Sequence, residues 1–260
     1  MQVYSIANQK GGVLKSVTAL SLAILLSRME RRVLLIDFDP QSSISDTFCD
    51  DQEREAKAFY RVLQDTAGIR ECIIHLSPTL HFIPNDLELE RFPMKAIMTG
   101  DADQYIIMEK LDDIKDDYDL VILDCPPNQT YLNILALTAS DIVIVPTHRS
   151  TWTAKGTTLI LDSIQKIKTK KKSRVQIGRV ILFPTKVHRK RRRIFSDHEF
   201  REFTERLKAS FHDGFITVSD VTIPHDENAC ALEDVTRESV ATISLDILKV
   251  YQKFIDKEGL

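Results

Sequence analysis

One octapeptide near the N-terminus gathers two glycines, two lysines and a serine: Gln9-Lys10-Gly11-Gly12-Val13-Leu14-Lys15-Ser16. A glycine-rich turn between a strand and a helix presents backbone N–H groups and a helix N-terminus to a phosphate, and glycine lets the backbone approach without a Cβ. Lys15 would then place its ammonium near the β- and γ-phosphates of a nucleotide, and the Ser16 hydroxyl would bind Mg²⁺. The octapeptide therefore predicts a phosphate-binding loop.

The spacing of the glycines excludes two common phosphate loops. The plain P-loop would need glycines where Gln9 and Leu14 stand, and the absence of G-x-G-x-x-G argues against a nicotinamide enzyme. The octapeptide matches instead the deviant form Lys-Gly-Gly-x-x-Lys-[Ser/Thr], in which Lys10 is an additional lysine. The alternative is a solvated glycine turn with incidental lysines.

Three aspartates follow apolar runs elsewhere in the chain. Asp37 and Asp39 come after one run, and Asp124 comes after another. Ligands gather at the carboxyl ends of the strands of an open parallel sheet, so these sites can converge with the loop on one nucleotide. Asp124 would hold Mg²⁺ through its water shell, Asp37 would support the metal shell, and Asp39 would orient a water for in-line attack on the γ-phosphate. A lone aspartate at a strand end is usually a cap or turn residue, but three at these positions favour the catalytic interpretation.

The elements that must position these residues are short apolar runs separated by helical patterns. The runs are nearly continuous, which is typical of strands buried on both faces of a parallel sheet; they are Val3–Ile6, Val33–Ile36, Leu80–Ile83, Leu120–Leu123, Ile142–Val145 and Val180–Phe183. Helices are expected over Val17–Met29, Tyr105–Lys115, Tyr131–Ala139, Thr157–Lys168 and Phe200–Phe211. The alternation predicts an α/β fold with a doubly wound, mainly parallel sheet and helices on both faces, of the P-loop NTPase type. We expect one domain over residues 1–260.

Composition narrows the class of protein. The 260 residues are 43% hydrophobic and 28% charged with 8 Gly and 9 Pro, which is globular rather than disordered or fibrous. No run approaches the roughly 20 apolar residues of a membrane span, and residues 1–8 lack the pattern of a signal peptide. Four scattered cysteines without a Cys-x-x-Cys pair are typical of a reducing cytosol. The sequence shows neither a transition-metal ligand spacing nor a Gly-x-Ser-x-Gly elbow.

The net charge of −3 conceals an asymmetry. Residues 163–196 hold 13 Lys or Arg and no Asp or Glu, which leaves 22 basic and 38 acidic residues elsewhere, a net of −16. The densest basic cluster is Lys186, Arg189, Lys190, Arg191, Arg192 and Arg193, and a second is Lys166, Lys168, Lys170, Lys171, Lys172 and Arg174. Such clusters would neutralise the phosphates of double-stranded DNA without reading its sequence. A solvated charged face is the alternative.

Taken together, these motifs resemble the ParA/MinD family of deviant-Walker ATPases, and specifically its ParA (Soj-like) DNA-partition branch. The resemblance covers most of the chain, and Asp39-Pro40-Gln41 and Asp124-Cys125-Pro126-Pro127 favour ParA over MinD. It implies ATP and Mg²⁺ as cofactors, and hydrolysis of ATP to ADP and phosphate with Lys10, Lys15 and Asp39 as catalytic residues. The implied nucleotide contacts are Lys10, Gly11, Gly12, Val13, Leu14, Lys15, Ser16 and Val17.

The same resemblance implies partners. Family members form an ATP-dependent sandwich homodimer, in which Lys10 would reach the phosphates of the other protomer. The dimer binds DNA without sequence preference, and a ParB-like centromere-binding protein stimulates slow hydrolysis. The implied role is segregation of a plasmid or chromosome, in the cytoplasm and on the nucleoid.

The chain also departs from the family pattern. Leu14 replaces a frequent glycine and Val17 a frequent threonine, and a branched residue at position 14 would resist the backbone geometry that glycine allows. The family's Glu-Ala-Pro-Ser block is absent, although Pro224 is still a candidate adenine contact. Two alternatives are therefore a hydrolysis-poor, nucleotide-switched DNA-binding regulator and a MinD-like, membrane-associated positioning ATPase. The balanced charges around Ile243–Ile255 favour a core-packing helix over a membrane anchor.

Overall fold

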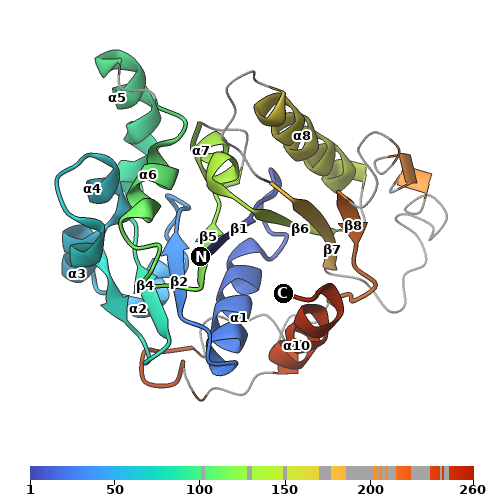
Figure 1. Cartoon of the computed structure of the whole chain (residues 1–260), viewed down its shortest axis with the longest axis horizontal. Coiled ribbons are helices and arrows are strands. Elements are labelled where there is room, and N and C mark those ends of the chain that lie inside the picture. The colour runs from blue at the N-terminus through green and yellow to red at the C-terminus, as the bar shows by residue number, and fades with distance from the viewer. Residues whose placement is uncertain are drawn as a thin grey trace.

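A computed structural model describes residues 1–100, 103–127, 131–148, 151–169, 177–185, 202–203, 205–206, 209, 215–223, 235–240, 242 and 246–260. Its centre is one sheet in the order β3-β4-β2-β5-β1-β6-β7-β8 (Figure 1). The strands are β1 Gln2–Ile6, β2 Val33–Asp37, β3 Ile74–His75, β4 Leu80–Ile83, β5 Leu120–Asp124, β6 Ile142–His148, β7 Arg179–Thr185 and β8 Ile216–Val218. Only the β3–β4 pair is antiparallel among the described strand pairs.

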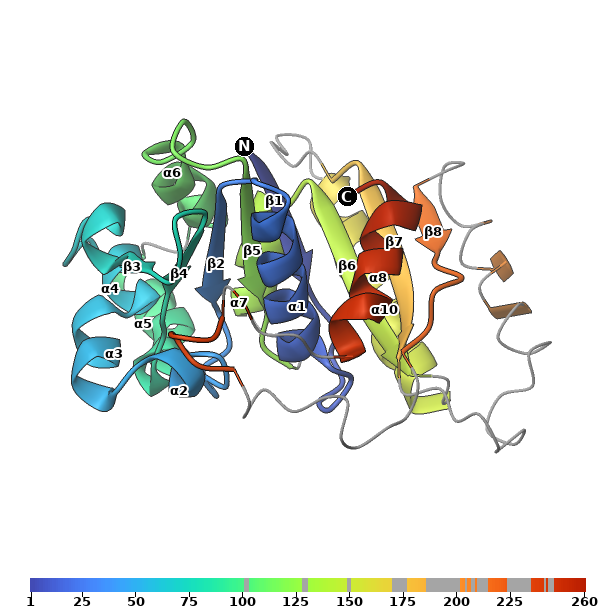
Figure 2. The same ribbon diagram turned by 90° about the horizontal axis from the view of Figure 1, so that it is seen from below.

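Helices cover both faces of the sheet, with α1 and α10 on one face and α7 and α8 on the other (Figure 2). The α-helices are α1 Lys15–Arg28, α2 Ser45–Phe48, α3 Asp51–Lys57, α4 Phe59–Leu63, α5 Phe92–Thr99, α6 Ile106–Asp112, α7 Tyr131–Ala139, α8 Thr151–Lys168 and α10 Asp246–Glu258. The structure also has two 3₁₀ turns, η1 Ile69–Cys72 and η2 Leu87–Arg91. The doubly wound, mainly parallel architecture is confirmed.

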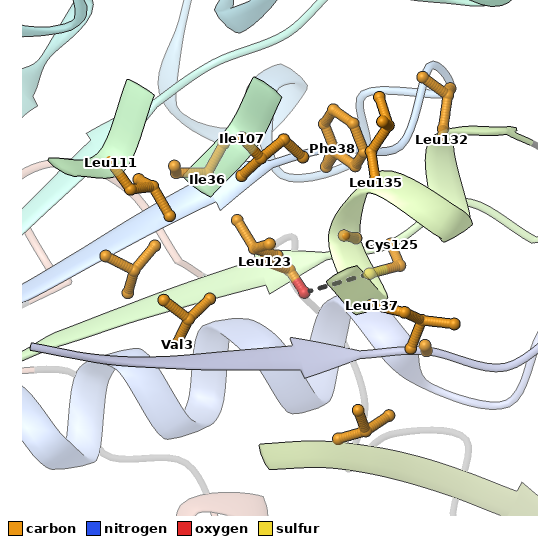
Figure 3. Packing of buried hydrophobic residues seen from close by; sticks show 14 of the residues in the cluster. Val3, Ile36, Phe38, Ile107, Leu111, Leu123, Cys125, Leu132, Leu135 and Leu137 are labelled. Carbon is orange, nitrogen blue, oxygen red and sulfur yellow. Dashed lines mark hydrogen bonds between the residues drawn. The ribbon is translucent and has the colours of Figure 1, made fainter. Parts of the chain in front are cut away.

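Two hydrophobic cores lie on opposite faces of the sheet, because successive strand residues point to alternate sides. On one side Ile36 of β2 and Leu123 of β5 pack with Ile107 of α6 and Leu135 of α7 (Figure 3). On the other side the intervening strand residues pack against α1 and α10. Burial on both faces explains why the strand sequences are continuous apolar runs rather than alternating ones.

All six predicted strands are present, and the structure adds two that the sequence pattern did not indicate. β3 has two residues and β8 has three, which is too short for a periodicity to be visible. Residues 41–58, where the sequence pattern predicted neither a strand nor a helix, contain α2 and α3. α8 begins six residues before the predicted start at Thr157, in a segment without an apolar stripe. Within the helix predicted over Phe200–Phe211, the described residues 202–203, 205–206 and 209 are helical, and the others lie outside the described residues.

The C-terminal helix packs on the core, as its sequence pattern predicts. Tyr251 and Phe254 of α10 are fully buried, and the Tyr251 hydroxyl lies 2.7 Å from Thr18 Oγ1 on α1. The apolar face of α10 is therefore occupied by the neighbouring helix. Among the described helices, none combines the length and apolarity that crossing a bilayer requires.

Candidate functional site

The loop between β1 and α1 turns through two residues of left-handed conformation. Gly12 has φ 70° and Leu14 has φ 69°, and α1 begins directly afterwards at Lys15. A Cβ added to Gly11 or Gly12 would meet no atom within 4 Å, so both glycines border open space rather than packed protein. A helix N-terminus has backbone N–H groups without intrahelical partners, which makes this space suitable for an anion.

Asn8 ties the beginning of this loop to the neighbouring strand. Its side chain is fully buried. The amide Nδ2 donates to the carbonyl oxygen of Pro146 on β6 at 2.8 Å, and Oδ1 accepts from the backbone N–H of Lys10 at 3.0 Å. The backbone position of Lys10 therefore depends on β6.

Two threonines fix the other end of the loop. Thr185, at the end of β7, donates from Oγ1 to the Val13 carbonyl oxygen at 3.2 Å. Thr18, in the first turn of α1, donates from Oγ1 to the Leu14 carbonyl oxygen at 2.6 Å. The sequence singled out neither Asn8 nor Thr185, because Pro146 and Val13, their partners, lie far away along the chain. Thr18 was not singled out either, although its partner Leu14 is only four residues away.

Asp39 faces the loop from the end of β2. It is only 7% exposed, and burial raises the pKa of its carboxyl group. The Gln41 backbone N–H, which donates to Asp39 Oδ1 at 3.0 Å, and the nearby Lys15 ammonium partly offset that rise in pKa. The structure thus brings the predicted lysine and the predicted water-orienting carboxylate together.

The Asp37 carboxylate accepts hydrogen bonds from residues that follow it in the chain. Its Oδ2 accepts hydrogen bonds from the Ser45 backbone N–H at 2.9 Å and from the Ser45 hydroxyl at 2.7 Å, while Oδ1 accepts from the Asp39 backbone N–H at 3.2 Å. Burial raises the pKa of this carboxyl group to about 7 in spite of these donors. Asp37 would therefore support a metal site indirectly, because it holds the segment that carries Asp39.

Asp124, at the end of β5, lies opposite Asp37 in the β2–β5 register. It is fully buried, and within the described residues neither carboxylate oxygen has a hydrogen-bond partner. Burial, followed by the charge of Asp37, raises the pKa of Asp124 well above its usual range, and nearby Ser16 and Lys15 oppose the rise. Buried polar atoms without partners are costly, so Ser16 and Lys15 compensate this carboxylate only in part among the described residues.

These residues suit a bound Mg²⁺-nucleotide. A buried carboxylate near a serine hydroxyl supplies the kind of oxygen ligands that Mg²⁺ prefers, and Mg²⁺ usually keeps several of its waters. Lys15 is buried beside it and supplies a positive charge for phosphate. Lys10, Gly11, Gly12, Val13, Leu14, Ser16 and Val17 lie on the loop or in the first turn of α1.

Several predicted contacts lie outside the described residues. They are Pro224, Lys186, Arg189, Lys190, Arg191, Arg192 and Arg193, together with Lys170, Lys171, Lys172 and Arg174 of the second basic cluster. Lys166 and Lys168 of that cluster are described and lie in the last turn of α8.

The conformation of Leu14 predicts an unusual order of variant stabilities. Alanine and glycine both remove the partial packing of Leu14, but only alanine retains the cost of a left-handed backbone. We therefore expect Leu14→Ala to be less stable than Leu14→Gly by about 1 kcal/mol, measured by urea unfolding. At exposed Met29, where φ is −87°, the alanine variant should be the more stable. A Leu14 pair ordered like the Met29 pair would contradict the prediction.

Comparisons with family models, known sequences and solved structures all find proteins that are similar to this chain. A family model described as an AAA domain (AAA_31) matches residues 1–177. The chromosome partitioning protein ParA of Caulobacter vibrioides is 32% identical over 185 residues, which cover 70% of this chain and 69% of that protein. The sporulation initiation inhibitor protein Soj of Bacillus subtilis is 29% identical over 182 residues, covering 70% and 72%. An ATP complex of Cyanothece McdA has a similar fold, with a TM-score of 0.79, 21% identity and coverage of 100% and 97%.

Proposed function

The chain belongs to the ParA/MinD family of P-loop ATPases, and from this premise we propose that it is a partition ATPase that hydrolyses ATP to segregate DNA. The observation that carries the proposal is Asp124, a fully buried carboxylate near Lys15 and Ser16 whose oxygens meet no hydrogen-bond partner of normal geometry among the described residues. A carboxylate in this state is best explained by a cation that the fold is built to receive. The ATP complex of McdA, which has the same fold, supports ATP as the nucleotide.

The proposed roles follow from the positions of the side chains. Lys15 and the loop backbone bind the phosphates, and Ser16 and Asp124 hold Mg²⁺, with Asp37 in support. Mg²⁺ supplies neutralisation of the charge on the phosphate oxygens. Asp39 orients the attacking water. Lys10, held by Asn8 at its backbone, directs its side chain to the nucleotide of a second protomer, and Pro224 contacts adenine.

Calorimetry and sedimentation test this function directly. Titration of the full chain with ATP and Mg²⁺ should show saturable binding, and sedimentation velocity should show a dimer with ATP but a monomer with ADP. The matched control is Lys15→Gln, which removes the charge and keeps a polar side chain that is one atom shorter. If magnesium and adenine nucleotide give no binding heat with the wild-type chain, the proposed function is wrong.

The proposed dimer binds double-stranded DNA without sequence preference, through the basic cluster at 186–193. If each protomer contacts about three phosphates, the log–log slope of DNA affinity against salt should be roughly −5. Replacing Arg191, Arg192 and Arg193 with alanine should weaken binding and make this slope shallower, as measured by fluorescence anisotropy over a salt series. The analogous triple change of Lys170, Lys171 and Lys172 is the control for charge alone. An unchanged affinity after the arginine changes would exclude this cluster as the DNA-binding face.

We further propose that hydrolysis is slow and is stimulated by a ParB-like centromere-binding protein. The protein would act in the cytoplasm, on the nucleoid. Residues 1–260 would form one domain. A second candidate function is a nucleotide-switched DNA-binding regulator with little hydrolysis, which the replacement of the family's frequent glycine by Leu14 favours. Phosphate release measured with DNA and the cognate partner separates the two, because only the partition ATPase is stimulated. A membrane-associated function is disfavoured because α10 buries its apolar face against α1.

A further inference from the structure

Gly156, within α8, lies where an added side chain would collide with Asn8 at the start of the phosphate loop. The helix runs from Thr151 to Lys168, and Gly156 is buried against the beginning of the phosphate loop. A Cβ at this position would lie 2.9 Å from Asn8 Oδ1 and 3.7 Å from the Lys10 backbone nitrogen. The first distance is shorter than a van der Waals contact, so either Asn8 or the helix would have to move.

Asn8 is not free to move aside. Its orientation is fixed by two partners of opposite kind, because Pro146 offers only a carbonyl acceptor and the Lys10 backbone offers only an N–H donor. Rotating the amide would break both hydrogen bonds in a fully buried position, where unpaired polar groups are costly. A methyl group at position 156 would therefore be felt at the Lys10 backbone.

We propose that Gly156 is a positioning residue for the phosphate loop: its missing side chain leaves the space in which Asn8 holds the Lys10 backbone in place. This inference deepens the proposed function and rests on it. It gives α8 a role at the nucleotide site in addition to covering the sheet. Gly156 itself contacts no substrate in this proposal and acts through Asn8.

The test compares three single variants of the full chain. We expect Gly156→Ala and Asn8→Ala each to weaken binding of a fluorescent ATP analogue with Mg²⁺ about tenfold, the loss expected for one disrupted buried hydrogen bond. Alanine has a higher helix propensity than glycine. We therefore expect the Tm of Gly156→Ala to fall too little for unfolding to explain the lost affinity. Gly68→Ala is the matched control, since its Cβ would meet nothing closer than 3.4 Å, and it should bind like wild type. Wild-type affinity in Gly156→Ala would overturn the inference.

The double variant tests whether Gly156 acts through Asn8. In an Asn8→Ala background the added methyl group has space, so Gly156→Ala should cause no further loss of affinity, whereas additive losses would overturn the inference. Amide hydrogen exchange without nucleotide gives an independent measurement: the Lys10 amide should exchange faster in both single variants than in wild type. If wild type fails to bind nucleotide, the proposed function fails, and unchanged Lys10 exchange in Gly156→Ala would separately overturn the role of Gly156.

Discussion

Replacing Asp39 with alanine should slow ATP hydrolysis by about 100-fold or more while Mg²⁺-ATP binding persists. The carboxylate is buried beside Lys15 and is positioned by the Gln41 backbone, as a group that orients water must be. General-base and water-positioning groups typically contribute 10²- to 10⁴-fold. Phosphate release with DNA and partner measures the loss, and gel filtration should show dimers that ATP traps on DNA.

The control for this variant is Asp46→Ala, which removes an exposed carboxylate a few residues away. Asp46 forms an ion pair with Arg54 at the surface, where such pairs contribute little, so hydrolysis should be unchanged. A monomeric Asp39→Ala protein that does not bind DNA would contradict the proposed mechanism, because loss of hydrolysis alone should prolong the dimer.

Replacing Asp124 with alanine should have opposite effects on stability and on metal binding. Without metal, the variant loses a buried carboxylate that has no hydrogen-bond partner in the described part of the chain, so its free energy of unfolding should rise by about 1–3 kcal/mol. Affinity for Mg²⁺ in the presence of ATP should fall about 10- to 100-fold, as for other groups that orient a metal's water shell. Urea unfolding in EDTA and magnesium titration by calorimetry measure the two effects. A variant that is less stable without metal would show that Asp124 has a structural partner.

The pH dependence supplies a second measurement on the same variant. The pKa of Asp124 is raised on folding, so its contribution to stability is fully present below about pH 4, the pKa of an unfolded aspartate, and is lost as pH rises through its folded pKa. Asp37, with a pKa of about 7, acts in the same direction between about pH 4 and 7. Metal-free wild type should therefore lose stability over this range, and Asp124→Ala should lose less. Asp119 is the contrast, because Arg32 lowers its pKa and its stabilisation is lost as pH falls.

The sequence predicted best those parts of the site that depend on one segment at a time. Each carboxylate follows its own apolar run. Because ligand sites of parallel sheets lie at the carboxyl ends of the strands, this was enough to predict that Asp39 and Asp124 lie near Lys15. The role of Asn8 could not be predicted because its partner on β6 is 138 residues away along the chain. The hydrogen bond between Thr185 and Val13 joins residues that are 172 positions apart. Such contacts depend on strand order, which no local pattern contains.

Leu14 is a case in which the sequence indicated a conformational preference that the structure does not follow. The sequence indicated that a branched residue would resist the geometry of glycine, yet Leu14 adopts φ 69°. Its carbonyl oxygen accepts from both the backbone N–H and the hydroxyl of Thr18, and its side chain packs partly on the core. These contacts offset the cost of the left-handed backbone, and a preference derived from one residue cannot include them.

The contact between α1 and α10 has a consequence for how the protein is made. Thr18 and Tyr251, whose hydroxyl groups meet, are separated by 233 positions. At about 5–20 residues per second, a ribosome needs roughly 10–50 s to synthesise the chain between them. During translation, part of the apolar surface of α1 therefore stays uncovered until α10 has emerged.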